Sequence, residues 1–340
     1  DKLVDALLVQ TELSPGKDVA PTLVTEPAVL AHACPLAPVM PVSMALVVSR
    51  LTRVAPSKRK IGVVLRPCEL RALIELVKLK QASLENLLLI GLDCSGTRSL
   101  ADYRAFHQGA AGSVDAFLAK DGGDIREACQ VCEYFTPWNA DLVIGLFGVD
   151  TTRQVLLQAM TLQGEEVLAA LKLPEAVAEG RETAIAEIKA KRLQKKKEMF
   201  ERVQGETAGD NLPGIFASCT NCHNCRVACP VCYCRECFLE SPTFEWEAEK
   251  YLALAEKKGA LRLPADTLLF HLTRLTHVGI SCVGCGLCQD ACPEGIPLFP
   301  LFRFTGDKAQ ELFDYVPGRS LEEEPPLTMF QEDELGWVEK

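Results

Sequence analysis

Two cysteine motifs constrain this chain more than any other feature. They span residues 219–230 and 282–293, and both have the spacing C-x2-C-x2-C-x3-C-P. Three thiolates at three-residue steps can surround one face of a cubic iron–sulfur cluster, whereas the proline turns the fourth cysteine toward a second cluster. Two copies therefore predict two 4Fe–4S clusters, each taking one ligand from the other motif.

The spacing assigns four cysteines to each cluster. The first set is Cys219, Cys222, Cys225 and Cys292. The second set is Cys229, Cys282, Cys285 and Cys288. Zinc is the main alternative, but its tetrahedral sites usually use two separated pairs of cysteine or histidine. Disulfides are not expected, because the chain has 16 cysteines and no export signal, a combination that favours metal ligands in the cytoplasm.

Composition excludes several function classes. A net charge of −10 argues against nucleic acid as a partner, and against a redox sensor that reads DNA. The longest apolar stretch, residues 35–48, contains three prolines and is shorter than the roughly 20 residues of a membrane span. No Ser–His–Asp, paired-carboxylate or HExxH arrangement supports hydrolysis.

The first half of the chain has an α/β pattern. Apolar runs at 60–65, 87–92 and 141–149 predict strands, and 69–79 predicts a helix between the first two. Strand, helix and strand in this order form a βαβ unit. The fold class expected is an α/β N-terminal domain with a partly parallel sheet, followed by a mostly helical two-cluster ferredoxin domain.

Four segments are expected. They are an α/β domain at 1–174, a charged linker helix at 175–210, a ferredoxin domain at 211–300 and a tail at 301–340 that packs over the surface or onto a partner. Ser241-Pro242 can start one helix between the motifs, with Gly259 ending it, and Asp266 can start another. The linker helix carries a basic cluster, interpreted as a solvated face or a docking surface: Lys189, Lys191, Arg192, Lys195, Lys196 and Lys197.

Four cysteines of the first half form a third candidate set. Cys68 and Cys94 follow successive strands, and Cys129 and Cys132 form a CxxC pair. Strands of a parallel sheet end at a common edge, so these thiols should lie close together and hold a third cluster. Helix amides should also stabilise a thiolate at Cys68. The alternative is two buried core thiols beside a dithiol or half a zinc site.

Three further thiols follow the first motif directly. Cys232, Cys234 and Cys237 could hold a fourth centre with Cys34 or a non-cysteine ligand, or compete for the neighbouring cluster. His271 and His277 are interpreted as packing or hydrogen-bonding residues. His223 and Asn224 could tune a cluster by hydrogen bonds to sulfur.

The first half resembles a known family. KIGVVLRPCELRALIELVKL (60–79), LIGLDCSG (89–96) and CQVCEYFTPWNADLVIGLFG (129–148) are similar to the beta subunits of coenzyme F-420-reducing hydrogenases and formate dehydrogenases. The resemblance implies a 4Fe–4S cluster on the third set beside a bound FAD. The helical insertion between the motifs is similar to ferredoxin domains of heterodisulfide-reductase iron–sulfur subunits. The resemblances imply an oxidoreductase subunit in a complex of the formate dehydrogenase, hydrogenase or heterodisulfide-reductase type.

The flavin contacts and the hydride partner stay open. The chain has no GxGxxG fingerprint and no P-loop, so Arg66, Glu69 and Arg71 are candidates only by their place beside Cys68. A deazaflavin coenzyme or NAD(P)H could supply hydride to the flavin, which would pass single electrons to clusters. The alternative is a flavin-free iron–sulfur wiring subunit with no catalytic site of its own.

Overall fold

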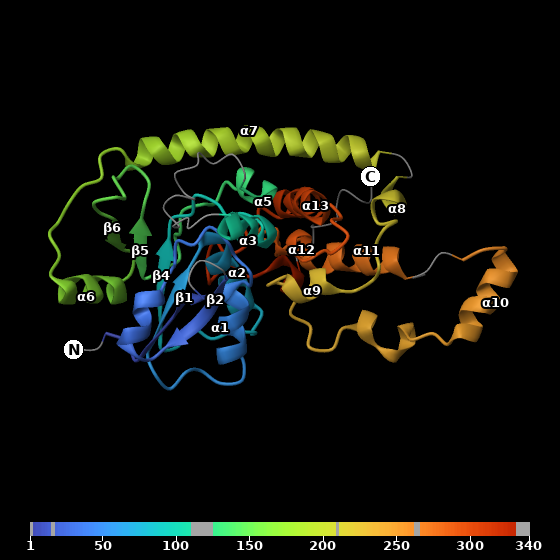
Figure 1. Ribbon diagram of the computed structural model, residues 1–340, viewed down its shortest axis with the longest axis horizontal. Helices are drawn as coiled ribbons and strands as arrows, with labels where there is room; N and C mark the ends of the chain where they lie inside the picture. Colours follow the sequence, from blue (N-terminus) through green and yellow to red (C-terminus); the bar gives the residue numbers. More distant parts are fainter. Residues whose placement is uncertain (1–2, 15–17, 110–124, 209–210, 262–265, 331–340) are drawn as a thin grey trace.

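A six-stranded mixed sheet forms the N-terminal half of the protein (Figure 1). The computed structural model describes residues 3–14, 18–109, 125–208, 211–261 and 266–330. The strand order is β2-β1-β3-β4-β5-β6, with parallel pairing from β1 through β5 and an antiparallel strand at each edge. The strands are β1 (Ala6–Ser14), β2 (Asp18–Val24), β3 (Ile61–Leu65), β4 (Leu87–Leu92), β5 (Leu142–Gly145) and β6 (Leu156–Ala159).

Helices and loops cover both faces of the sheet. Helices α1 (Met44–Thr52) and α2 (Pro67–Lys78) pack on one face, where alternate strand residues such as Val63 and Leu65 are buried. Helix α6 (Leu162–Leu171) covers part of the opposite face through Val167. The β3–α2–β4 unit confirms the predicted βαβ connection and the α/β class.

Short helices build the cysteine-rich half, and longer ones frame it. The short ones are α8 (Leu212–Ile215), α9 (Asn224–Ala228), η2 (Phe238–Glu240), η3 (Pro242–Phe244) and α12 (Leu287–Asp290). The longer ones are α10 (Ala248–Lys258), α11 (Thr267–Val278) and α13 (Leu298–Leu312). Helix α10 projects away from the rest of the molecule (Figure 1).

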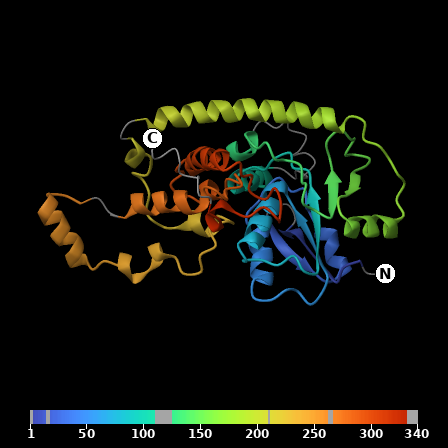
Figure 2. The ribbon, with the colours of Figure 1, turned by 180° about the vertical axis from the view of Figure 1, so that it is seen from behind.

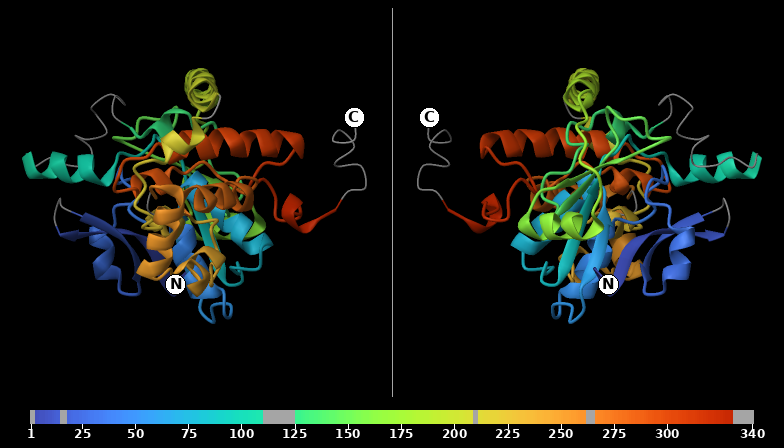
Figure 3. Two further views of the ribbon diagram at one scale, coloured as in Figure 1. Left: turned by 90° about the vertical axis from the view of Figure 1, so that its right-hand side faces the viewer. Right: turned by 90° about the vertical axis from the view of Figure 1, so that its left-hand side faces the viewer.

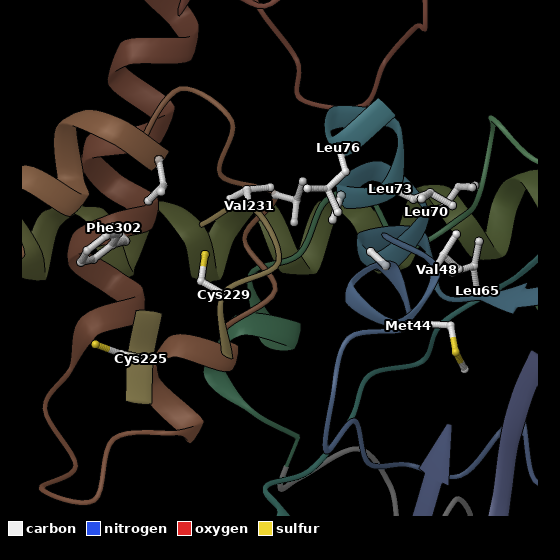
Figure 4. Close-up of a cluster of buried hydrophobic side chains, with 14 of the residues drawn as sticks. Met44, Val48, Leu65, Leu70, Leu73, Leu76, Cys225, Cys229, Val231 and Phe302 are labelled. Atoms are coloured by element: carbon white, nitrogen blue, oxygen red, sulfur yellow. The ribbon is translucent and has the colours of Figure 1, made fainter. Parts of the chain in front are cut away.

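One apolar core joins the two halves. Figure 4 shows the cluster extending from Met44 and Leu73, beside the sheet, to Cys229 and Phe302 in the cysteine-rich half. Helix α7 (Arg181–Thr207) runs along one long side of the molecule and lies against α5 (Glu127–Gln130) and α13 (Figures 2 and 3). The halves therefore pack as one body.

Several boundaries differ from the sequence-based expectation. The charged helix begins at Arg181 rather than near residue 175, because Gly180 and Arg181 pass against Gly148, which fixes the entry of the chain. Ser241-Pro242 starts only the 3-10 turn η3, which packs on η2 through Phe244 and Phe238, so the longer helix α10 begins later. Gly259 ends α10 with φ 77°, and α11 follows Asp266, as predicted.

The C-terminal part is more deeply packed than a surface tail. Residue 300, the expected boundary, lies inside α13, whose apolar face is buried against α7, α11 and α12. After α13, Glu75 of α2 accepts hydrogen bonds from the Tyr315 hydroxyl and the Gly318 amide. The 3-10 helix η4 (Pro326–Thr328) follows. In the described part of the chain, no helix is long and apolar enough to cross a membrane.

Candidate functional site

All four thiols of the first cysteine set line one pocket. The pocket lies between α9, α11 and the loop that follows α12, and its wall also includes Phe270 and His271. His271 is buried and stacks on Phe216, with Nε2 3.3 Å from Sγ of Cys219. The Asn221 amide donates a hydrogen bond to the same sulfur at 3.4 Å. His271 thus has the packing and hydrogen-bonding role expected of it.

Arg274 adds a buried cation at the back of this pocket. Its Nη1 donates to Sγ of Cys225 at 3.0 Å and its Nη2 to the Cys225 carbonyl at 3.1 Å. The guanidinium also lies over the ring of Phe302, 4.8 Å from its centroid. The positive charge of Arg274 lowers the pKa of the Cys225 thiol, but burial has the larger effect and raises this pKa above its usual value.

The second set forms around the loop that leads into α12. Cys229 reaches it from the end of α9 and interacts electrostatically with Cys285 and Cys288. Cys292 interacts in the same way with Cys219 and Cys225 of the first set. The thiols are thus grouped across the two motifs as the spacing predicts, while cluster ligation itself stays a prediction.

The spacing of the side chains disfavours a single metal ion. Among the described residues, no three cysteine, histidine or acidic side chains are close enough to hold one ion. Zinc–sulfur bonds of about 2.3 Å would require thiolates nearly in contact. A four-iron cluster would instead lie between thiolates that are farther apart, so the spacing is compatible with a cluster.

The third set gathers at the carboxyl edge of the sheet. Cys68 lies in the first turn of α2, directly after β3, and Cys94 follows β4. Cys129 and Cys132 come from α5 and the turn after it, and the Cys94 thiol interacts with both. The structure thus brings all four predicted residues together.

Opposing effects act on the thiols of this set. Burial would raise the pKa of Cys129, but the Arg126 guanidinium and hydrogen bonds from Thr97 lower it below its usual value. Burial instead raises the pKa of Cys68, and Glu69 and Cys285 raise it further. The effect of burial and of these neighbours is therefore larger than that of the helix amides, which were expected to stabilise a thiolate at Cys68. A coordinated iron would reverse this balance, because thiols deprotonate on binding metal.

A small pocket, with a cavity volume of about 30 Å³, opens beside Cys94 at the same edge. Arg66 and Asp93 supply its charged walls, and Leu36, Leu92 and Leu146 its apolar walls. Arg66 is held there by the carbonyls of Ala37 and Val39 and by the Gln10 side chain. Small-molecule sites combine apolar walls with few polar groups in this way.

The other two flavin candidates are engaged elsewhere. Glu69 accepts hydrogen bonds from the amides of Met44 and Arg66. Arg71 donates to the carbonyls of Pro317 and Val283. Both are buried within contacts between elements, so only Arg66 of the three candidates lines the pocket.

The second and third sets are neighbours. The Cys68 thiol interacts with Cys285, and Arg71 joins α2 to the carbonyl of Val283, which lies between two cysteines of the second set. Arg126 pairs with Asp290 of α12 while its Nη2 lies 3.8 Å from Sγ of Cys129. Buried arginines therefore connect the sheet edge to the second motif.

The remaining cysteines divide between two places. Cys34 packs with Tyr103 in a small cluster beside the sheet, and burial raises its pKa to about 11. Cys232, Cys234 and Cys237 lie beyond α9, where Cys232 interacts with the other two. Cys232 and Cys237 pack against the main core, and Cys34 does not. A fourth centre on Cys232, Cys234 and Cys237 stays a prediction.

The basic cluster of α7 is not a uniformly solvated face. Lys189, Lys191 and Lys197 are exposed, but Arg192 is buried and donates to the carbonyls of Ser95 and Cys132. Lys196 pairs with Glu133 at 2.7 Å. The helix turns these two side chains inward because it lies over the third set.

Sequence reasoning missed the polar side chains that surround the thiols. Arg126, Arg274 and Asp93 have no motif of their own, although each is buried beside a cysteine or its loop. Spacing within helices gave a weak signal, since Arg274 follows His271 by one turn. His223, considered as a sulfur donor, instead pairs with Glu240 at 3.4 Å.

Comparison with known proteins confirms the resemblance to the beta subunits. No protein-family model matches the chain. It is 28% identical over 357 residues to the F420-dependent formate dehydrogenase subunit beta of Methanocaldococcus jannaschii, covering 93% of this chain and 88% of that one. It is 26% identical over 305 residues to the F420-dependent formate dehydrogenase 1 subunit beta of Methanococcus maripaludis, covering 79% and 75%. Both relatives are subunits of an oxidoreductase.

A solved structure gives a more distant likeness. A chain of the F420-reducing [NiFe] hydrogenase complex from Methanosarcina barkeri aligns with a TM-score of 0.44 and 14% identity, covering 59% of this chain and 81% of that chain.

Proposed function

We propose that this chain, a relative of the beta subunits of F420-dependent formate dehydrogenases, is the electron-transfer subunit of a multisubunit oxidoreductase. It would pass electrons between a flavin at the sheet edge and partner subunits through 4Fe–4S clusters. A complex of the formate dehydrogenase type is the host that its relatives suggest.

The order of the three cysteine sets is the observation that supports this most strongly. Cys68 of the third set interacts with Cys285 of the second, and Cys288 of the second interacts with Cys225 of the first. Cys222 of the first set is exposed. The sets thus form a continuous series from the sheet edge to the surface, as a one-electron route requires.

The flavin would lie next to the third set, on the side where Arg66 lines a small pocket beside Cys94. A bound flavin supplies the junction between two-electron hydride chemistry and one-electron transfer. Arg66 would place a positive charge at that site. Its guanidinium is held in position by hydrogen bonds to two backbone carbonyls. Leu92 and Leu146 would exclude water from the flavin.

The names of both relatives include the coenzyme F420. A deazaflavin coenzyme is therefore the first candidate for this chain, ahead of NAD(P)H. Reduction of the purified protein by each carrier, followed by flavin absorbance, separates the two.

The direct test is the content of iron, acid-labile sulfide and flavin per chain, in protein purified without oxygen. Three clusters correspond to about twelve irons, and we expect these with one FAD. Iron without flavin would replace the proposal by a flavin-free wiring subunit. About eight irons would remove the third cluster from the route.

A further inference from the structure

Arg274 occupies a special position between the first and second cysteine sets. It projects from α11, and its side chain is buried, with 3% of the residue exposed. Its guanidinium donates to Cys225 of the first set and interacts with Cys229 and Cys288 of the second. No other described arginine donates a hydrogen bond to a thiol of either set.

The charge of Arg274 is not balanced by a carboxylate. Within the described ranges, no acidic side chain lies within ion-pair distance of its guanidinium, and its Nε is buried without a hydrogen-bond partner. Burying an isolated cation is strongly unfavourable. The negatively charged clusters that the surrounding thiols would hold are therefore the counter-charge for Arg274.

We propose that Arg274 is a positioning residue that raises the reduction potential at the first cysteine set relative to the second. This inference rests on the proposed function, since both sets must hold clusters. Hydrogen bonds to ligand sulfur and nearby positive charge both favour the reduced form, which carries one more electron. The effect is greater at the first set, because Arg274 contacts Cys225 directly.

The electron balance is simple. One electron leaves the second set and one enters the first, with no bond broken and no proton moved. Arg274 stays protonated throughout, because arginine does not lose its proton in proteins. In the poorly hydrated interior its charge is weakly screened. It would therefore draw the electron toward the exposed end of the route, where Cys222 lies.

The test compares Arg274→Gln and Arg274→Lys with the unmodified full chain. Anaerobic redox titration followed by electron paramagnetic resonance measures the potentials, and iron analysis measures cluster content. In Arg274→Gln we expect the electron-exchange equilibrium between the two clusters to shift at least tenfold toward the second set, or about 59 mV. Arg274→Lys keeps the charge but not the fork geometry, so we expect a smaller shift in the same direction.

Arg226→Gln is the matched control. Arg226 follows Cys225 in the chain, but it pairs with Glu240 toward the surface, so its loss should leave both potentials unchanged. Full iron with unchanged potentials in Arg274→Gln would overturn the inference and leave the proposed function intact. If Arg274→Gln loses iron, the test uses Arg274→Lys instead. Full iron content with unchanged reduction potentials in Arg274→Lys would also overturn the inference. A parent protein without clusters would contradict the proposed function instead.

Discussion

Arginines lie beside buried or partly buried thiols at the candidate site. Arg274 contacts Cys225, Arg126 lies beside Cys129, and Arg192 binds the carbonyl of Cys132. A buried cation needs a nearby anion, and a thiolate in an apolar interior needs a cation or a metal. If the thiols hold clusters as proposed, the same contacts would meet both requirements.

Cys129→Ser tests the third set directly. Serine keeps the approximate size but is a poor ligand for iron, so we expect a loss of about four irons from about twelve. Iron and sulfide analysis of anaerobically purified protein measures the result. Cys34→Ser is the control, because Cys34 packs beside Tyr103 and outside the three sets. The iron content of this variant should stay unchanged. Equal iron in both variants would remove Cys129 from the ligands.

The two motifs could be predicted from sequence because local spacing alone determines how their thiols are grouped. Cys68 and Cys94 could be placed because parallel strands end at one edge of a sheet. Arg126 and Asp290 could not be paired, since they meet only after α12 packs on α5. Three strands were also missed: β2 and β6, which lie at the sheet edges, and β1, which lies inside the sheet between β2 and β3. Exposure at the edges weakens the patterns of β2 and β6.

The contact between α5 and the second motif depends on one glycine. Gly286 has φ 76°, and a Cβ there would lie 2.5 Å from Cβ of Ala128, next to Cys129. Such a distance is too short for two non-bonded carbon atoms, so a side chain would force the second and third sets apart. The elements therefore meet as closely as their backbones allow.

Gly286→Ala should disturb both sets, and Gly295→Ala provides the control. Gly295 also has positive φ, at 63°, but a Cβ there would meet nothing within 4 Å. Both variants share the backbone strain of about 1 kcal/mol, and Gly286→Ala adds a steric cost of about 1–3 kcal/mol. We expect lower iron content only in Gly286→Ala, and we expect Gly286→Ala to unfold at lower denaturant concentration than Gly295→Ala. Identical behaviour would show that backbone strain alone matters.

At the scale of the whole molecule, the two halves differ in what stabilises them. The sheet half has parallel strands and helices whose hydrogen bonds and apolar contacts need no metal. The cysteine-rich half has short helices, and its thiols Cys225 and Cys229 form part of the buried core shown in Figure 4. Burial raises the pKa of Cys229 to about 12, so without iron this thiol is neutral at physiological pH.

Removing iron should therefore unfold the molecule unevenly. When structure depends on a metal centre, the binding free energy becomes folding free energy, and its loss falls on the segments that supply the ligands. After anaerobic chelation we expect amide hydrogen exchange to rise at 219–237 and 280–296 and to stay slow in β3 and β4. Exchange measured by mass spectrometry, with the iron-loaded protein as control, resolves these segments. Unchanged exchange at 219–237 would mean that the cysteine-rich half is stable without its clusters. Fast exchange in β3 as well would mean that the shared core makes the two halves a single cooperative unit.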